Sequence, residues 1–233
     1  VFSLYLGLSI AALFALGTGL FMGPLLGLLG AGENTYHYAQ QYTTCVIVIG
    51  GIPTVLSNVL ANLIRSIGPS PEASAGIILG GLLNIALDPL FMFVLLPRGQ
   101  EVLGAGLATC LSNCVALLFF LVVLARMGRG SIITFSPKAG LPQRSSIVAV
   151  FGVGIPSAIT TLLFDLDYVV IDKLMVSYHD VALAAVGIVL KVERFPLNVG
   201  VGICQGMLPL VAYDYSAGNQ QRMNDAIRLS RRL

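Results

Sequence analysis

The sequence predicts an all-α integral membrane protein, built as a polytopic helix bundle. Only 10% of its 233 residues are charged, against about 25% in a typical soluble domain. Mean hydropathy is +0.89, and no charge precedes Glu33. Only helices or closed barrels satisfy their backbone polar groups inside lipid. The apolar runs are far longer than the ~10-residue strands of a membrane barrel, so helices are expected.

Six apolar runs are long enough to span a bilayer, which takes ~20 helical residues. They cover residues 2–29, 39–65, 73–96, 103–126, 146–178 and 181–213. Turn-forming residues such as Gly68-Pro69 separate them. Gly76 and Gly80 form a small-xxx-small pair that suits close helix packing. The longest break, 127–145, is expected to link two halves of the protein.

Basic residues predict the orientation of the chain. If residue 1 faces the cytoplasm, the outer loops contain only Arg98 among Lys and Arg. The cytoplasmic segments then contain Arg65, Arg126, Arg129, Lys138, Arg144, Arg222, Arg228, Arg231 and Arg232. This asymmetry follows the positive-inside rule.

Asp88 is the most informative residue of the first half, because it interrupts a run that is otherwise apolar from Ala73 to Leu96. A carboxylate there costs about 2.5–3.5 kcal/mol on insertion scales. Asn84 precedes it by four residues, so the two side chains share a helix face. An amide beside a carboxylate can bind a proton or a cation. The alternative is a structural Asp that hydrogen-bonds a neighbouring helix.

The second half carries more charge within its apolar runs. Asp165 and Asp167 are two residues apart, so at most one is expected to face a given site. Lys191, Glu193 and Arg194 fall inside the last run and must be paired or hydrated. We expect Asp165 and these three residues to face a lumen, with Glu193 compensating Lys191 or Arg194. A structural salt bridge is the alternative.

Several classes of function find no support in the sequence. No P-loop, Gly-x-Ser-x-Gly or His/Cys metal spacing is present, so no enzyme and no cofactor is expected. The net charge of +2 is too small to indicate nucleic acid binding. The four cysteines are expected to be apolar packing residues. His37 and His179 are expected in outer turns.

The sequence resembles the multidrug and toxic compound extrusion (MATE) transporters. The matching stretches are Ile64-Arg65-Ser66-Ile67-Gly68, Asn84-Ile85-Ala86-Leu87-Asp88, Gly104-Ala105-Gly106-Leu107-Ala108-Thr109, Gly154-Ile155-Pro156 and Gln205-Gly206-Met207-Leu208-Pro209-Leu210-Val211-Ala212-Tyr213, followed by Gly218-Asn219 and Arg222. These stretches keep the order and spacing found in the family, and together they extend over essentially the whole chain. Asp214 departs from the family, which often has Asn at that position.

The resemblance implies twelve helices in two lobes, of which this chain looks like helices three to eight. Residues 1–126 would be four helices of the N-terminal lobe, 127–145 the cytoplasmic interlobe loop, and 146–233 the first two helices of the C-terminal lobe. The chain begins inside an apolar run and ends at Arg231-Arg232-Leu233, so we expect a fragment whose partners include the missing helices.

The resemblance also implies a function. Family members export organic, often cationic, compounds in exchange for H⁺ or Na⁺, as multi-pass proteins of the cell membrane, here of the prokaryotic inner-membrane type. The implied coupling site comprises Asn84, Asp88 and Thr109, which are also the implied Na⁺ ligands. Drug-like small molecules and the lipid bilayer are the expected partners. A lipid-linked saccharide flippase of the wider superfamily is the alternative, and a membrane scaffold is a third possibility.

Overall fold

The computed structural model describes residues 2–29, 31–127, 144–176 and 180–230, and in this part of the chain helices are joined by short turns, with no strand. The helices are α1 (Phe2–Leu20), α2 (Met22–Leu28), α3 (Glu33–Thr43), η1 (Thr44–Ile49), α4 (Gly51–Ile67), α5 (Ser70–Pro89), η2 (Leu90–Leu95), α6 (Glu101–Met127), α7 (Arg144–Val176), α8 (Asp180–Ser216) and α9 (Gln220–Ser230). Five of the described helices can cross a membrane, or six if a bent pair counts as one span. The predicted helical membrane fold is confirmed.

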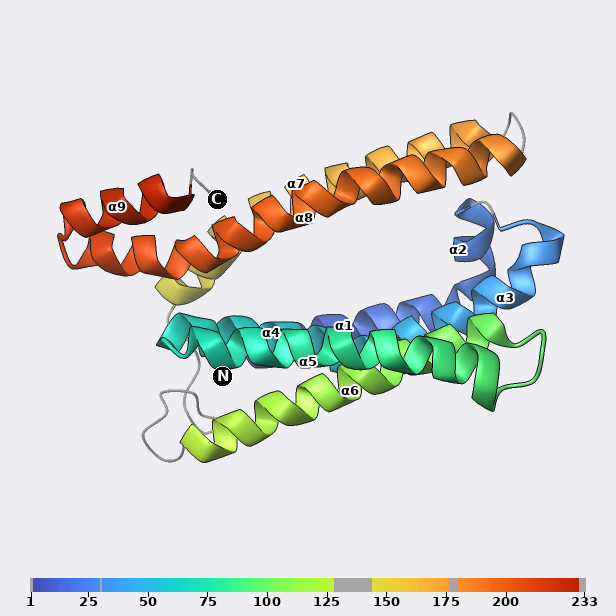
Figure 1. Cartoon of the computed structure of the whole chain (residues 1–233), viewed down its shortest axis with the longest axis horizontal. Helices are drawn as coiled ribbons and strands as arrows, with labels where there is room; N and C mark the ends of the chain where they lie inside the picture. The colour runs from blue at the N-terminus through green and yellow to red at the C-terminus, as the bar shows by residue number, and fades with distance from the viewer. Residues whose placement is uncertain (1, 30, 128–143, 177–179, 231–233) are drawn as a thin grey trace. The chain divides into compact units, whose positions relative to one another are not determined.

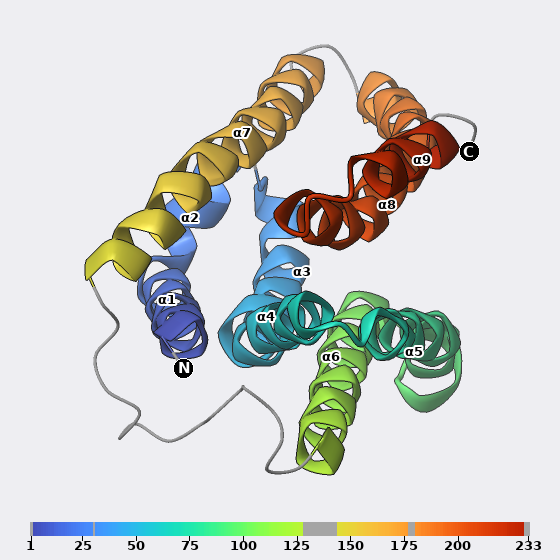
Figure 2. The same cartoon turned by 90° about the vertical axis from the view of Figure 1, so that its left-hand side faces the viewer.

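The chain divides into two compact units, Val1–Ile147 and Val148–Leu233. In the first unit α6 packs beside α4 and α5, and α1 packs against α4 (Figures 1 and 2). Its buried core lies where α4, α5 and α6 meet and comprises Leu60, Ala61, Ile64, Ala73, Phe120 and Leu124. The tight centre of this unit is therefore a three-helix junction.

Glycines permit the close approach of α5 to α6. A side chain at Gly76 would collide with the ring of Phe120, and a Cβ at Gly80 would lie 3.1 Å from the Cβ of Ala116. Both glycines therefore face α6, as expected for a small-xxx-small pair that brings two helices together. This prediction is confirmed.

Prolines explain where the predicted runs bend. A proline has no N–H for the carbonyl four residues earlier, and its ring crowds that carbonyl. Pro53 follows the π-helical η1, and η1 and α4 meet at a bend of 48°. Pro89 ends α5 and is followed by the π-helical η2. The run 2–29 was expected to be continuous, but it breaks at Phe21, three residues before Pro24.

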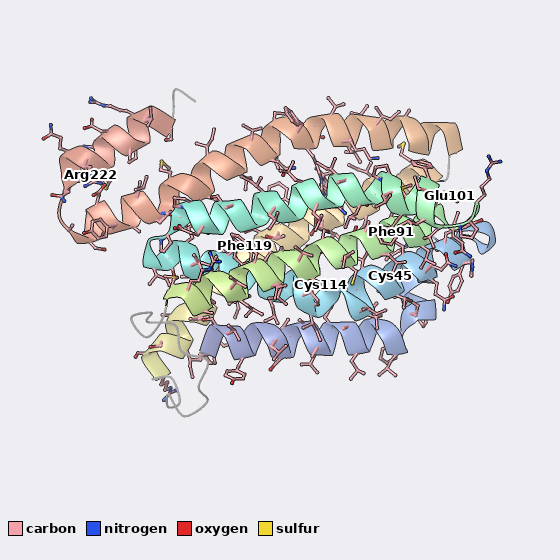
Figure 3. The ribbon with its side chains drawn as sticks, turned by 60° about the horizontal axis from the view of Figure 1, so that its bottom comes forward. Cys45, Phe91, Glu101, Cys114, Phe119 and Arg222 are labelled. Carbon is pink, nitrogen blue, oxygen red and sulfur yellow. The ribbon has the colours of Figure 1, made fainter. Side chains whose placement is uncertain are left out.

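The helix connections of the first unit alternate between its two ends. The start of α1, the α4–α5 connection and the end of α6 lie at one end of the bundle, and the η2–α6 connection lies at the other (Figures 1 and 3). Arg65 and Arg126 therefore share one end, and Arg98 lies at the opposite end. His37 lies within α3 rather than in a turn, because this helix extends beyond the apolar run. His179 lies outside the described residues.

The second unit comprises most of α7, with α8 and α9. The turn between α8 and α9 uses Gly218 at φ +72°, where a side chain would be strained. Within this turn the Asn219 N–H donates to the carbonyl of Asp214 over 2.9 Å. Helix α9 was not predicted, since its polar composition gives no apolar run. Of the predicted linker 127–145, residues 128–143 lie outside the described residues.

Candidate functional site

The structure brings Asn84, Asp88 and Thr109 together between α5 and α6. The side-chain amide of Asn84 donates to Oδ1 of Asp88 over 3.3 Å and to Oγ1 of Thr109 over 3.3 Å. All three residues are half-buried. Thr109 lies 25 residues beyond Asn84, so packing of the two helices makes this contact. We call these three residues the amide-linked cluster; their role stays a prediction.

The helix ends beside the cluster fix its geometry. Pro89 directly follows Asp88, and the chain then continues into η2. A Cβ at Gly104 would lie 3.0 Å from the backbone of Phe91, so α6 begins in close contact with η2. Figure 3 shows Phe91 and Glu101 at this same end of the bundle. This contact brings the first turns of α6, including Thr109, alongside the end of α5.

The cluster presents oxygen atoms suited to a proton or a hard cation. The Thr109 hydroxyl donates to the Ala105 carbonyl over 2.9 Å, so its oxygen lone pairs remain available to the cluster. Asp88 contributes a carboxylate within a predicted membrane span, where such groups mark ion pathways or proton relays. Among the described residues no group of three or more His, Cys, Asp or Glu gathers. The carboxylate, amide and hydroxyl oxygens of the cluster are the type of ligand that hard cations take.

A second polar contact, not predicted from the sequence, continues the cluster along α6. Asn113 lies one turn beyond Thr109, and its amide donates to the Thr54 hydroxyl on α4 over 2.9 Å. The Thr54 hydroxyl in turn donates to the Gly50 carbonyl over 2.7 Å. A cavity of about 90 Å³ lies beside this pair, and Ser57 and Asn58 contribute to its lining. The four-residue spacing from Thr109 was the available sequence signal.

In the second unit, a cavity of about 440 Å³ lies between α7 and α8. Asp165, Asp167, Glu193 and Arg194 contribute to its lining, whereas Lys191 does not. The expectation that at most one of Asp165 and Asp167 faces a single site is therefore wrong, because the cavity is wide enough to contact both. Tyr168, which the sequence analysis did not single out, also lines it.

The ion pair in this cavity differs from the predicted one. Arg194 pairs with Asp165 on α7, with Nη2 and Oδ1 3.8 Å apart, rather than with Glu193. Residues one or two apart on a helix do not face each other, so Glu193 is poorly placed to compensate either Lys191 or Arg194. The guanidinium of Arg194 also lies over the ring of Tyr168, 4.1 Å from its centroid.

The four cysteines are free, and their burial differs. Cys45 is buried, Cys110 and Cys114 are half-buried, and Cys204 is exposed. A Cβ at Gly106 would lie 2.9 Å from the Cβ of Cys45. Cys45 therefore helps to close the junction of η1 with α6.

Comparisons with known proteins give a consistent result. The MatE family model matches residues 156–232. The multidrug export protein MepA of Staphylococcus aureus (strain MW2) is 30% identical over 227 residues, which are 97% of this chain and 49% of the relative. MepA of Staphylococcus saprophyticus is 30% identical over 228 residues, 98% of this chain and 49% of the relative. The chain thus spans about half the length of the curated relatives that it matches.

Solved structures share the fold. An outward-facing multidrug resistance MATE family transporter superposes with a TM-score of 0.82 at 22% identity, covering 99% of this chain and 50% of that one. A point mutant of the Vibrio cholerae MATE transporter VcmN gives 0.76 at 22% identity, covering 97% and 50%. With its apolar helices, the chain is a multi-pass membrane protein. The chain is thus similar to the MatE family model over residues 156–232, to the MepA proteins along nearly its whole length, and to MATE transporters in its fold.

Proposed function

We propose that this chain is part of a secondary active transporter that exports drug-like organic compounds, often cationic, in exchange for H⁺ or Na⁺. The amide-linked cluster would bind the coupling ion. The observation that carries the proposal is the pair of 3.3 Å contacts from Asn84 to Asp88 and to Thr109, made between two apolar helices. The MepA relatives are multidrug export proteins, which supports export over a saccharide flippase.

The hydrogen bonds suggest how each coupling ion would bind. A proton could neutralise Asp88 while Asn84 keeps its two donor contacts, since a protonated carboxyl still has an acceptor oxygen. Sodium needs oxygen ligands, so the Asn84 amide would have to turn its Oδ1 toward Asp88 and Thr109. The hydroxyl proton of Thr109 already goes to the Ala105 carbonyl, which leaves its oxygen free for a cation.

Reconstituted transport by the whole protein tests the proposal. Proteoliposomes loaded with a fluorescent organic cation would be given a proton gradient or a sodium gradient separately, so that each ion is assessed alone. Asp88→Asn keeps the shape of the side chain and removes its ionisable charge, so gradient-driven transport is expected to be abolished. Glu72→Gln is the matched control, because Glu72 is exposed in the first turn of the same helix.

The outcomes of this experiment distinguish the role of Asp88 from the exchange function itself. Transport that responds to a gradient in the wild type and in Glu72→Gln, but not in Asp88→Asn, would support the coupling site. Wild-type transport by Asp88→Asn under both gradients would reject Asp88 as the coupling residue. Absence of gradient-driven transport in the wild-type protein would reject the exchange function itself.

A further inference from the structure

The cavity between α7 and α8 contains an aromatic ring and a carboxylate side by side, and the chain's own Arg194 occupies the position between them. The guanidinium carbon of Arg194 lies 4.1 Å from the ring centroid of Tyr168. Its Nη2 lies 3.8 Å from Oδ1 of Asp165. The face of an aromatic ring attracts ligand cations such as quaternary ammonium groups, and a neighbouring carboxylate adds to this attraction. The three side chains therefore form a cation site that holds an internal cation.

Helical spacing builds the walls of this cavity. Asp165 and Tyr168 are three residues apart on α7 and share one face. Arg194, Leu197 and Val201 follow the same spacing on α8 and line the opposite wall. The volume of about 440 Å³ falls within the ~300–1,000 Å³ of small-molecule sites. The cavity thus has room for an organic ion beside the ring.

The contacts that hold Arg194 are weak. The 3.8 Å separation from Asp165 exceeds the length of a hydrogen bond. The Arg194 side chain is 49% exposed and that of Asp165 67%, so α7 and α8 do not enclose either side chain. Of the charged residues that line the cavity, Asp165, Asp167 and Glu193 are acidic and Arg194 alone is basic. An incoming cation therefore meets an excess of negative charge and a guanidinium that can be displaced.

We propose that Asp165 and Tyr168 form a subsite for an organic monocation and that Arg194 is a tethered competitor, which leaves as the cation enters. The inference rests on the proposed export function and adds to it a subsite, its ligand class and a residue that limits affinity. Arg194 would then lower the affinity for cationic compounds relative to uncharged ones of the same size.

Equilibrium binding of ethidium, a fluorescent monocation, to the purified whole protein tests this inference. Arg194→Gln removes the competitor and is expected to lower the Kd about 3–10-fold, the range given by an exposed ion pair and cation–π contact. Arg194→Met, which is long and uncharged, is expected to do the same and serves if Arg194→Gln does not fold. In the Arg194→Gln background, Tyr168→Leu and Asp165→Asn are each expected to raise the Kd again.

Lys191→Gln is the matched control, since it removes the same charge from α8 at a residue that does not line the cavity. Its Kd for ethidium is expected to stay within about twofold of wild type. The inference would be overturned by an unchanged or higher Kd in both Arg194 variants, or by equal tightening in Lys191→Gln. Equal tightening toward an uncharged dye of similar size would also overturn it, because added space rather than removed charge would then explain the effect.

Binding without a gradient separates this inference from the proposed function. A protein that binds ethidium more tightly after Arg194→Gln, yet shows no gradient-driven transport, would retain the subsite and reject the exchange function. A protein that exports cations but binds ethidium with the same Kd in the wild type and in Arg194→Gln would retain the exchange function and reject the subsite.

Discussion

The side-chain amide of Asn113 on α6 donates a 2.9 Å hydrogen bond to the Thr54 hydroxyl on α4. Both residues are half-buried, and the contact lies beside the core junction of the first unit. In a membrane, side-chain hydrogen bonds between helices contribute about 0.6 kcal/mol on average and up to ~1.7 kcal/mol. This contact therefore tethers α4 to α6 with modest strength.

A double-mutant cycle measures that tether. Asn113→Ala and Thr54→Ala are each expected to lower the free energy of unfolding, with a coupling energy of about 0.6–1.7 kcal/mol between them. Unfolding in mixed micelles gives the values. Ser57→Ala is the control for Thr54→Ala, because the Ser57 hydroxyl donates within its own helix, to the Thr54 carbonyl. Additive effects of the two substitutions would show that the hydrogen bond between Asn113 and Thr54 does not stabilise the folded protein.

Gly76 provides a sharper test of helix packing. Gly76→Ala places a methyl group against the Phe120 ring, so it is expected to destabilise the first unit by about 1–3 kcal/mol. Gly81→Ala, on the same helix with no atom within 4 Å of its added Cβ, is expected to change stability by less than about 0.5 kcal/mol. Phe120→Leu should partly rescue Gly76→Ala. Equal effects of the two alanines would contradict close packing at Gly76.

Local sequence signals predicted most of the helices but not every bend. Long apolar runs marked the membrane helices, and turn residues marked their ends. The break at Phe21 was missed, although Pro24 provides a physical reason for it. Helix α9 was missed because its stability comes from packing on the end of α8 rather than from an apolar run of its own.

Contacts between helices determine how much of each candidate site could be predicted from the sequence. Asn84 and Asp88 could be paired from a four-residue spacing, and the resemblance added Thr109. The Asn113–Thr54 bond joins residues 59 apart in sequence, and spacing cannot supply that distance. Arg194 was expected to be compensated within its own helix, whereas the structure pairs it with Asp165 and Tyr168 across the cavity. The rotation of α7 against α8 decides this pairing.

Thr109 tests whether an oxygen is needed in the amide-linked cluster. Thr109→Val keeps the side-chain shape and removes the oxygen that accepts from Asn84. It is expected to weaken the apparent affinity for the coupling ion about tenfold, as for a lost hydrogen bond in a charged site. Thr109→Ser keeps the hydroxyl and should stay near wild type. The half-saturating ion concentration for dye transport measures both, and equal values for Val and Ser would exclude Thr109 as a ligand.

Asp214 on α8 and Arg222 on α9 form an ion pair in which one side chain is buried and the other is exposed. The Asp214 residue is 2% exposed, and Oδ1 of its side chain has no hydrogen-bond partner. The Nε of Arg222, whose side chain is 71% exposed, lies 3.7 Å from that oxygen. Figure 3 labels Arg222 on α9. Arg222 is therefore the solvent-facing partner of a buried carboxylate.

Removing Arg222 should therefore weaken the docking of α9 more than removing the charge of Asp214. Arg222→Gln leaves the Asp214 carboxylate buried without its cation, so α9 is expected to dock about 1–3 kcal/mol more weakly. Asp214→Asn removes the buried charge and should cost much less, and the double variant should recover most of the loss. Protease protection of the α8–α9 turn in the whole protein measures docking, and Arg228→Gln, also on α9, is the control. Equal loss of protection in Arg222→Gln and Arg228→Gln would contradict a specific contact with Asp214, because general charge on α9 would then account for its docking.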